Sequence, residues 1–124
     1  MPRWSAVLAA LTLLACSHRQ GPGPVTAGAP AELGVIVENQ FSGMVTVFLE
    51  AGGRSIRLGE VHFSETKSFV VPWRSVGDGL STQLRGEVIG SEERVLTSDL
   101  RMRPGSVVRW TLTPRLSMSY YTVY

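Results

Sequence analysis

From residue 32 to residue 124, short apolar runs alternate with polar positions. The runs are rich in β-branched and aromatic residues, and Gly, Pro, Ser or Asp recurs about every ten residues, which is the pattern of successive β-strands. No stretch keeps helical spacing over several turns, so a parallel α/β sheet with crossover helices is excluded. The pattern predicts an all-β domain, a seven- to eight-stranded antiparallel β-sandwich. The predicted strands lie near 33–39, 44–51, 54–61, 66–73, 80–89, 94–102 and 107–113, with an eighth extended segment at 117–124.

The segment 44–51 has the clearest alternation and predicts one arm of a hairpin. Gly52-Gly53 follows as a two-residue connection that tolerates positive φ, which is typical of tight hairpin turns. On the face that points away from the core, Phe48 then lies opposite Arg57, and Glu50 lies diagonal to Arg57. These three side chains predict an exposed cation–π and ionic cluster. A hairpin closed at this turn pairs Ala51 with Arg54, Leu49 with Ile56 and Val47 with Leu58.

The turn at Pro104-Gly105 predicts a different connection. A tight hairpin there places Leu100 opposite Arg109 and mixes apolar with charged side chains on both faces. The connection therefore either carries a β-bulge or is an arch that crosses between two sheets, which is the version that a sandwich favours. In the segment that follows the turn, alternation directs three side chains to the core: Val108, Trp110 and Leu112.

The first sixteen residues have the layout of a bacterial secretory signal. Arg3 provides a positive charge, and an apolar stretch of about a dozen residues follows, which is too short for a spanning helix. Leu13-Leu14-Ala15-Cys16 resembles the bacterial lipobox. The resemblance implies that residues 1–15 are a lipoprotein signal peptide and that Cys16 carries covalent lipid and anchors the chain to a membrane. The alternative is an ordinary cleaved signal peptide that leaves Cys16 as a free thiol.

Residues 16–31 then form the lipidated cysteine and a Gly/Pro-rich tether, and residues 32–124 form the β domain. As a flexible coil, the tether has an end-to-end distance of about 20 Å. Ser17 follows the cysteine in place of the aspartate that favours inner-membrane retention in enteric bacteria. The predicted location is therefore the bacterial cell envelope, on the periplasmic face of the outer membrane.

Composition changes this picture in two respects. The formal charge of the chain is +2, and it falls to +1 when Arg3 is removed with the signal peptide, so the sequence does not indicate a nucleic-acid partner. Because Cys16 is the chain's single cysteine, an intrachain disulfide is excluded and packing alone must hold the β domain together.

The sequence does not provide a recognisable catalytic set. His62 is the only histidine of the β domain, it follows a predicted strand, and no nucleophile motif accompanies it. Glu92-Glu93 fits a solvated turn better than a paired acid and base. Metal ligands and phosphate-binding glycine loops are missing as motifs, so we expect no enzyme activity and no cofactor beyond the lipid on Cys16.

Two clusters are candidate binding surfaces. Arginines around the Pro104-Gly105 turn suit carboxylates or lipid phosphates, and the alternative is a solvated strand face balanced by nearby acids. Tyrosines in the last predicted strand suit a protein interface or sugar stacking, and the alternative is an edge strand that closes a sheet. The residues are Arg101, Arg103, Arg109 and Arg115 in the first cluster, and Tyr120, Tyr121 and Tyr124 in the second.

The β domain resembles small lipoproteins of environmental Gram-negative bacteria, which look like immunoglobulin- or transthyretin-like sandwiches without assigned activity. The resemblance supports the fold alone. From the anchor, the tether and the lack of a catalytic set, we expect a non-enzymatic envelope lipoprotein that docks onto another envelope protein. The alternative functions are a glycan- or peptide-binding module that uses Trp73 and the tyrosines, and an enzyme with a site around His62. The segments that carry the resemblance are Val37-Glu38-Asn39, Arg57-Leu58-Gly59, Val71-Pro72, Ile89-Gly90-Ser91 and Arg103-Pro104-Gly105.

Overall fold

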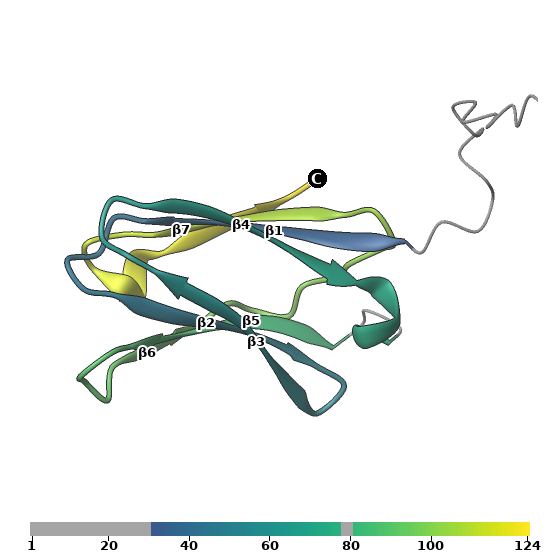
Figure 1. Cartoon of the computed structure of the whole chain (residues 1–124), viewed down its shortest axis with the longest axis horizontal. Coiled ribbons are helices and arrows are strands. Elements are labelled where there is room, and N and C mark those ends of the chain that lie inside the picture. Colours follow the sequence, from purple (N-terminus) through teal and green to yellow (C-terminus); the bar gives the residue numbers. More distant parts are fainter. Residues whose placement is uncertain (1–30, 78–80) are drawn as a thin grey trace, which may run out of the picture.

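The computed structural model describes residues 31–77 and 81–124, which form an all-β domain of two layers (Figure 1). The predictions for the signal peptide, for Cys16 and for the tether up to residue 30 lie outside the described residues. The elements of the described residues are β1 (Glu32–Asn39), β2 (Val45–Ala51), β3 (Arg54–Val61), β4 (Thr66–Pro72), the 3₁₀ helix η1 (Trp73–Ser75), β5 (Thr82–Val88), β6 (Arg94–Leu96), β7 (Val107–Leu112), the 3₁₀ helix η2 (Leu116–Met118) and β8 (Tyr120–Val123).

Within the described residues the strands form two sheets. Sheet A has the order β4-β1-β7-β8, and sheet B has the order β3-β2-β5-β6. The prediction of an all-β, sandwich-like fold is confirmed, but the prediction of purely antiparallel pairing is wrong, because β1 and β7 pair in parallel. Parallel neighbours need a long crossover, and residues 40–106 provide it with strands of both sheets: β2, β3, β5 and β6 of sheet B and β4 of sheet A.

The β2–β3 hairpin closes at Gly52-Gly53, where φ is +56° and +77°, as the turn chemistry predicts. The predicted pairs of Ala51 with Arg54 and of Leu49 with Ile56 are confirmed. The pair of Val47 with Leu58 is wrong, since the register shifts between Val47 and Phe48 and Val47 faces Gly59. The shift is a β-bulge that leaves Leu58 without a partner on β2.

The cation–π contact of Phe48 involves Arg85 of β5, not the predicted Arg57. The guanidinium carbon of Arg85 lies 4.5 Å from the ring centroid of Phe48. Glu50 and Glu87 hold it there, at 3.1 Å from Nη1 and 3.4 Å from Nε. Arg57 does lie across from Phe48 in the register, but its guanidinium pairs with Glu60 at 3.0 Å on the same edge strand. The charges of this outer face of sheet B therefore largely neutralise one another.

The Pro104-Gly105 connection is an arch, because β6 belongs to sheet B and β7 to sheet A. The predicted strand 94–102 is wrong beyond Leu96. Thr97 ends the ladder: its Oγ1 accepts the N–H of Leu84 at 2.9 Å, in place of a main-chain carbonyl. Beyond it, an isolated bridge between Thr82 and Leu100 keeps the arch against β5 while the chain crosses to sheet A.

The core lies between the inner faces of the sheets. Leu33, Val35 and Val37 alternate along β1. The prediction that Val108, Trp110 and Leu112 alternate into the core along β7 is confirmed. The same period-two pattern runs through β2 of sheet B. Each strand therefore contributes one apolar face to the core, and burial of these faces is the main source of stability in the domain.

Asn39 is a fully buried polar residue at the end of β1. Its Nδ2 donates to the carbonyls of Gly43 and Val61 at 2.9 and 3.0 Å, and its Oδ1 accepts the N–H of Phe41 at 2.9 Å. The side chain therefore fixes the turn that leads to β2 and ties it to the end of β3, at one end of the domain.

Candidate functional site

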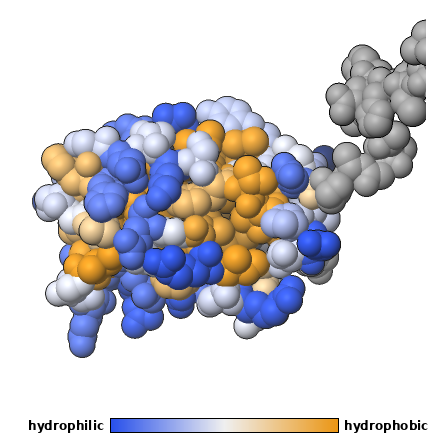
Figure 2. Space-filling model, in the orientation of Figure 1, coloured by the Kyte–Doolittle hydropathy of each residue, from blue (hydrophilic) through white to orange (hydrophobic). Residues whose placement is uncertain are grey.

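The open side of the domain between β3 and β4 carries an apolar surface, which we name the β3–β4 surface and define by Ile56, Leu58 and Phe69 between the sheets and by Val70 on the outer face of β4. β3 and β4 are edge strands of different sheets, and they diverge from their connecting turn on the near side of the molecule (Figure 1). Figure 2 shows hydrophobic residues gathered on this side of the domain. Ile56, Leu58 and Phe69 are half-buried, and Val70 is 64% exposed. The surface therefore exposes apolar groups beside the core.

The β-bulge and a glycine shape this surface. Leu58 has no partner on β2, and the register shift at this point lets β3 bend. The ring of Phe69 lies directly over Gly59, so that a Cβ added to Gly59 would stand 2.9 Å from Phe69 Cε1. A larger residue at position 59 would displace the phenyl ring, which links the edge of sheet A to the edge of sheet B.

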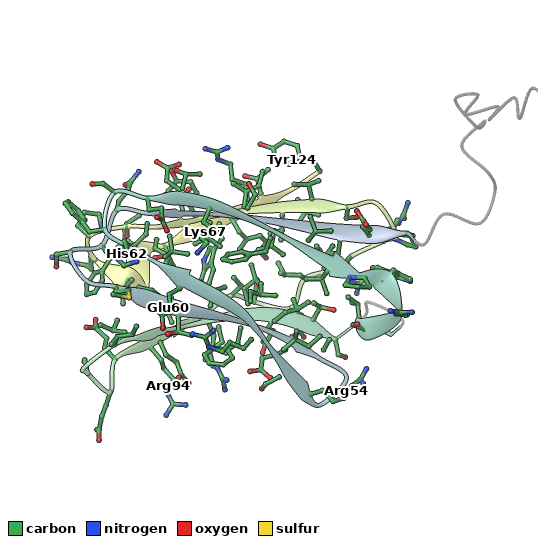
Figure 3. All side chains as sticks on the ribbon, in the orientation of Figure 1. Arg54, Glu60, His62, Lys67, Arg94 and Tyr124 are labelled. Atoms are coloured by element: carbon green, nitrogen blue, oxygen red, sulfur yellow. The ribbon has the colours of Figure 1, made fainter. Side chains whose placement is uncertain are left out.

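Charged groups lie along one rim of the β3–β4 surface. Lys67 Nζ donates to the main-chain carbonyl of Glu60 at 3.1 Å and lies 5.8 Å from the ring centroid of Phe69. The Glu60 carboxylate pairs with Arg57. Figure 3 shows Lys67 and Glu60 close together between the two layers, with His62 beyond them. The β3–β4 surface therefore has an apolar centre and a rim of both charge signs.

His62 lies in the turn between β3 and β4 and is exposed. The closest contact with a carboxylate here is made by its main-chain N–H, which donates to Glu65 Oε1 at 3.4 Å. Among the described residues, no three His, Cys, Asp or Glu side chains are grouped closely enough to hold a metal ion. The geometry around His62 does not assemble a base with an orienting acid.

Glu92 and Glu93 lie in the turn between β5 and β6, and both are exposed. The N–H of Glu93 donates to Ser91 Oγ at 3.0 Å, and its carbonyl accepts the N–H of Val88 at 3.0 Å. An open depression of about 470 Å³ lies beside them and is lined by Glu87, Val88, Ser91, Glu92, Glu93 and Arg94. The carboxylates face solvent, as in the predicted solvated turn.

The candidate arginines are spread over the domain instead of being gathered. Arg101 and Arg103 are exposed on either side of buried Met102, at the end where β1 begins, since the N–H of Gly105 donates to the carbonyl of Glu32. Arg115 follows the other end of β7, about 17 Å away along the strand.

Arg109 lies between these ends on the outer face of sheet A and forms an ion pair with Glu38 at 3.2 Å. Gln40 Nε2 also donates to Glu38, at 2.9 Å. The hydrogen bond from Gln40, together with the Arg109 guanidinium, lowers the pKa of Glu38 below its ordinary value. Arg109 is therefore engaged with its neighbour, whereas the ends of the domain hold Arg101, Arg103 and Arg115.

Tyr120 and Tyr121 belong to β8, the edge strand of sheet A, and Tyr124 follows it directly; their side chains point to different faces. Tyr121 packs against the core, and its hydroxyl shares a hydrogen bond of 2.5 Å with Ser98 Oγ. Tyr120 and Tyr124 are 58% and 72% exposed. Figure 3 shows Tyr124 on the side of sheet A that faces away from sheet B. Trp73 follows β4 at the opposite edge of sheet A, so it does not join the tyrosines in one platform.

The sequence pattern did not predict the β3–β4 surface, although it contains one signal for it. Phe69, Val70 and Val71 are three consecutive apolar residues in a strand, and successive side chains of a strand point to opposite faces. One of them must therefore face away from the core. The register identifies it as Val70, which pairs with Gly34 on the outer face of sheet A.

Comparison with known proteins does not assign this chain to a family. No protein-family model matches this chain, and no curated protein is significantly similar to it in sequence. Among the described residues, helices with the length and apolar character needed to cross a membrane are absent.

Proposed function

We propose that this protein is a membrane-anchored lipoprotein of the bacterial envelope, on the periplasmic face of the outer membrane. In this proposal its domain is an immunoglobulin- or transthyretin-like sandwich that acts as a non-catalytic docking module for another envelope protein. The observation that carries the docking role is the β3–β4 surface, where β4 exposes Val70 on its outer face and carries half-buried Phe69 on its inner face, with half-buried Ile56 and Leu58 on β3.

The lipobox resemblance of Leu13-Leu14-Ala15-Cys16 supports the anchor. Lipid on Cys16 would hold the chain stably in a membrane, because two or more acyl chains suffice for lasting attachment. In a chain anchored in this way, the end of the domain where β1 begins is the end nearest the lipid. Arg101 and Arg103 are exposed at that end, and their guanidinium groups suit lipid phosphates.

The composition of the β3–β4 surface supports docking of a protein. An exposed apolar patch rimmed by polar groups is characteristic of interaction sites. Phe69 and Leu58 would lose their remaining water contact under a partner, while Lys67 and the Arg57–Glu60 pair at the rim would favour a partner of complementary charge. The arrangement of β1 beside β7 in a mostly antiparallel, two-layered fold supports the sandwich type.

The anchor is tested by fractionation and acyl labelling of the full chain in a Gram-negative host. We expect the wild-type protein to incorporate a labelled fatty acid and to sediment with outer membranes. Cys16→Ser should lose the label and move to the soluble fraction. A wild-type chain that is unlabelled, or a Cys16→Ser chain that stays in the membrane, would contradict the lipoprotein proposal.

The docking surface is tested by quantitative co-purification from detergent-solubilised membranes. Val70→Asp places a charge at the outer margin of the surface, on β4, without touching the core, so we expect loss of the proteins that co-purify reproducibly with the wild type. Ile89→Asp is the matched control, because Ile89 is an exposed apolar residue outside the surface. Equal recovery with both variants would show that the β3–β4 surface does not dock the partner.

A further inference from the structure

The edge of sheet A at β8 differs from the other sheet edges among the described residues. Edge strands are usually protected against pairing with another chain by charges, proline, bulges or short length. β4 contains Lys67 and Pro72, β3 contains a bulge and Arg57, and β6 spans only Arg94–Leu96. β8 is also short, at four residues, but the segment 119–124, Ser-Tyr-Tyr-Thr-Val-Tyr, contains no proline, no bulge and no charged side chain.

The hydrogen bonds of β8 show which of its main-chain groups face the open edge. Tyr124 and Val107 exchange both hydrogen bonds, at 2.8 and 3.2 Å. In an antiparallel ladder such pairs alternate, so Thr122 and Tyr120 also bond to β7. The N–H and C=O groups of Tyr121 and Val123 therefore point away from β7, and no described strand lies on that side.

We propose that β8 pairs antiparallel with β8 of a second copy of this chain, about a two-fold axis that passes between the two Thr122 residues. In this register Tyr121 of one copy faces Val123 of the other, and the open N–H and C=O groups of both strands are satisfied by four hydrogen bonds. The interface is isologous, because each strand supplies the same groups to the other.

The side chains on the outer face of β8 are arranged so that two copies of this strand complement each other. Tyr120, Thr122 and Tyr124 lie on this face, and Tyr120 and Tyr124 are largely exposed in the single chain. In the proposed register Tyr120 lies across from Tyr124 of the second copy at both ends of the strand pair, and Thr122 lies across from Thr122 at the axis. Aromatic pairs and threonine pairs directly across an antiparallel ladder are favourable contacts.

The dimer does not depend on the proposed docking role. β8 and β4 lie at opposite edges of sheet A, so the β3–β4 surface stays exposed in the dimer. Failure of the dimer would leave the docking proposal standing, and failure of the docking proposal would leave the dimer standing. A second copy is favoured over an unrelated strand because the complementarity belongs to this chain's own sequence.

The test is disulfide cross-linking of the full chain in cells, using Thr122→Cys, mild oxidation and non-reducing gels. Thr122 is exposed, so the substitution spares the fold, and residues across from each other at non-hydrogen-bonded positions have Cβ atoms close enough for a disulfide. Thr66→Cys, exposed on the outer face at the opposite edge of the same sheet, is the matched control, and the unchanged chain measures the background from Cys16. We expect at least about tenfold more dimer with Thr122→Cys than with Thr66→Cys. Equal cross-linking would overturn the proposal.

Two further experiments test the register and the main-chain pairing. Chains with Tyr120→Cys and with Tyr124→Cys should cross-link to each other when co-expressed, and neither should cross-link to itself. Val123→Pro removes an N–H that points to the open edge and none that bonds to β7, so it should abolish the cross-link of Thr122→Cys, whereas Val123→Ala should retain it. A cross-link that survives Val123→Pro, or self-cross-linking of Tyr120→Cys, would overturn the proposed pairing.

Discussion

Two buried threonines, Thr82 in β5 and Thr97 just after β6, differ in whether their hydroxyl has a hydrogen-bond partner. Thr97 Oγ1 accepts the N–H of Leu84 at 2.9 Å, whereas Thr82 Oγ1 is buried without a partner among the described residues. Their side chains differ from valine only by the hydroxyl oxygen. The pair therefore separates the value of a satisfied buried hydroxyl from the cost of an unsatisfied one.

We expect Thr97→Val to destabilise the domain by about 1–3 kcal/mol, because the N–H of Leu84 would be left buried and unpaired. Thr82→Val should be neutral or stabilising, since it removes a polar atom that has no partner. Urea denaturation followed by circular dichroism measures both changes. A loss of stability in Thr82→Val as large as that in Thr97→Val would refute the assignment of these hydroxyls.

Glu38 gives a prediction of pH dependence. Gln40 and Arg109 lower its pKa in the folded state, so Glu38 stabilises the fold above its ordinary pKa, and this contribution is lost as the pH falls through the folded-state pKa. Gln40→Ala should raise the pKa of Glu38 toward the ordinary value, which an NMR titration of the side-chain carboxyl measures directly. Glu38→Gln should remove part of the loss of stability in acid below about pH 4. An unchanged pKa in Gln40→Ala would count against the hydrogen bond as the main cause.

At the scale of elements, the packing of sheet A on sheet B depends on Gly86 of β5. A Cβ at this position would stand 3.0 Å from Val45 Cγ1, 3.1 Å from Val95 Cγ1 and 3.3 Å from Cη2 of Trp110. Trp110 belongs to β7 of sheet A, and its indole is buried. The absence of a side chain at Gly86 therefore makes room for the largest buried side chain of the opposite sheet.

Gly86→Ala should destabilise the domain by about 1–3 kcal/mol, the usual cost of inserting a methyl group into a packed core. The tryptophan emission should shift to the red as water reaches Trp110. Val95→Ala should relieve part of the cost in the double variant, because it removes one of the three close contacts. Strict additivity of the two substitutions would contradict the packing described for Gly86.

Local patterns predicted the elements better than their pairing. Alternation and the Gly52-Gly53 turn identified β2, β3 and their hairpin, since both are properties of neighbouring residues. The bulge at Leu58 was not predictable from alternation, because its position depends on how Phe69 of the other sheet packs on Gly59. The choice of Arg85 over Arg57 as the partner of Phe48 likewise depends on β5, which is distant in sequence.

The same distinction applies to the candidate site. The arginines and tyrosines were candidates because of their residue types. In the structure, Arg101, Arg109 and Arg115 lie at different points along the length of the domain. The β3–β4 surface consists of ordinary apolar residues, whose exposure follows only from which strands lie at the edges. Val70 alone had a local signal, as the middle residue of an apolar triplet in a strand.

At the scale of the whole molecule, the surfaces are distributed so that they can be used together. The β3–β4 surface and the β8 edge lie at opposite edges of sheet A, and Arg101 and Arg103 lie at the end of the domain where β1 begins. A copy anchored through Cys16 could therefore present the β3–β4 surface sideways while β8 meets a second copy. The anchor, the docking surface and the β8 edge are each tested by a separate substitution with a separate measurement.

Site-specific photo-cross-linking in living cells tests most directly whether the β3–β4 surface docks an envelope protein. A photoreactive phenylalanine analogue is introduced at Val70 in the full chain, and the same analogue at Ile89 is the control. We expect the Val70 chain to form one reproducible adduct that the Ile89 chain does not form, with a protein of the cell envelope as the second component. Absence of an adduct at Val70, or the same adducts from both positions, would contradict the claim.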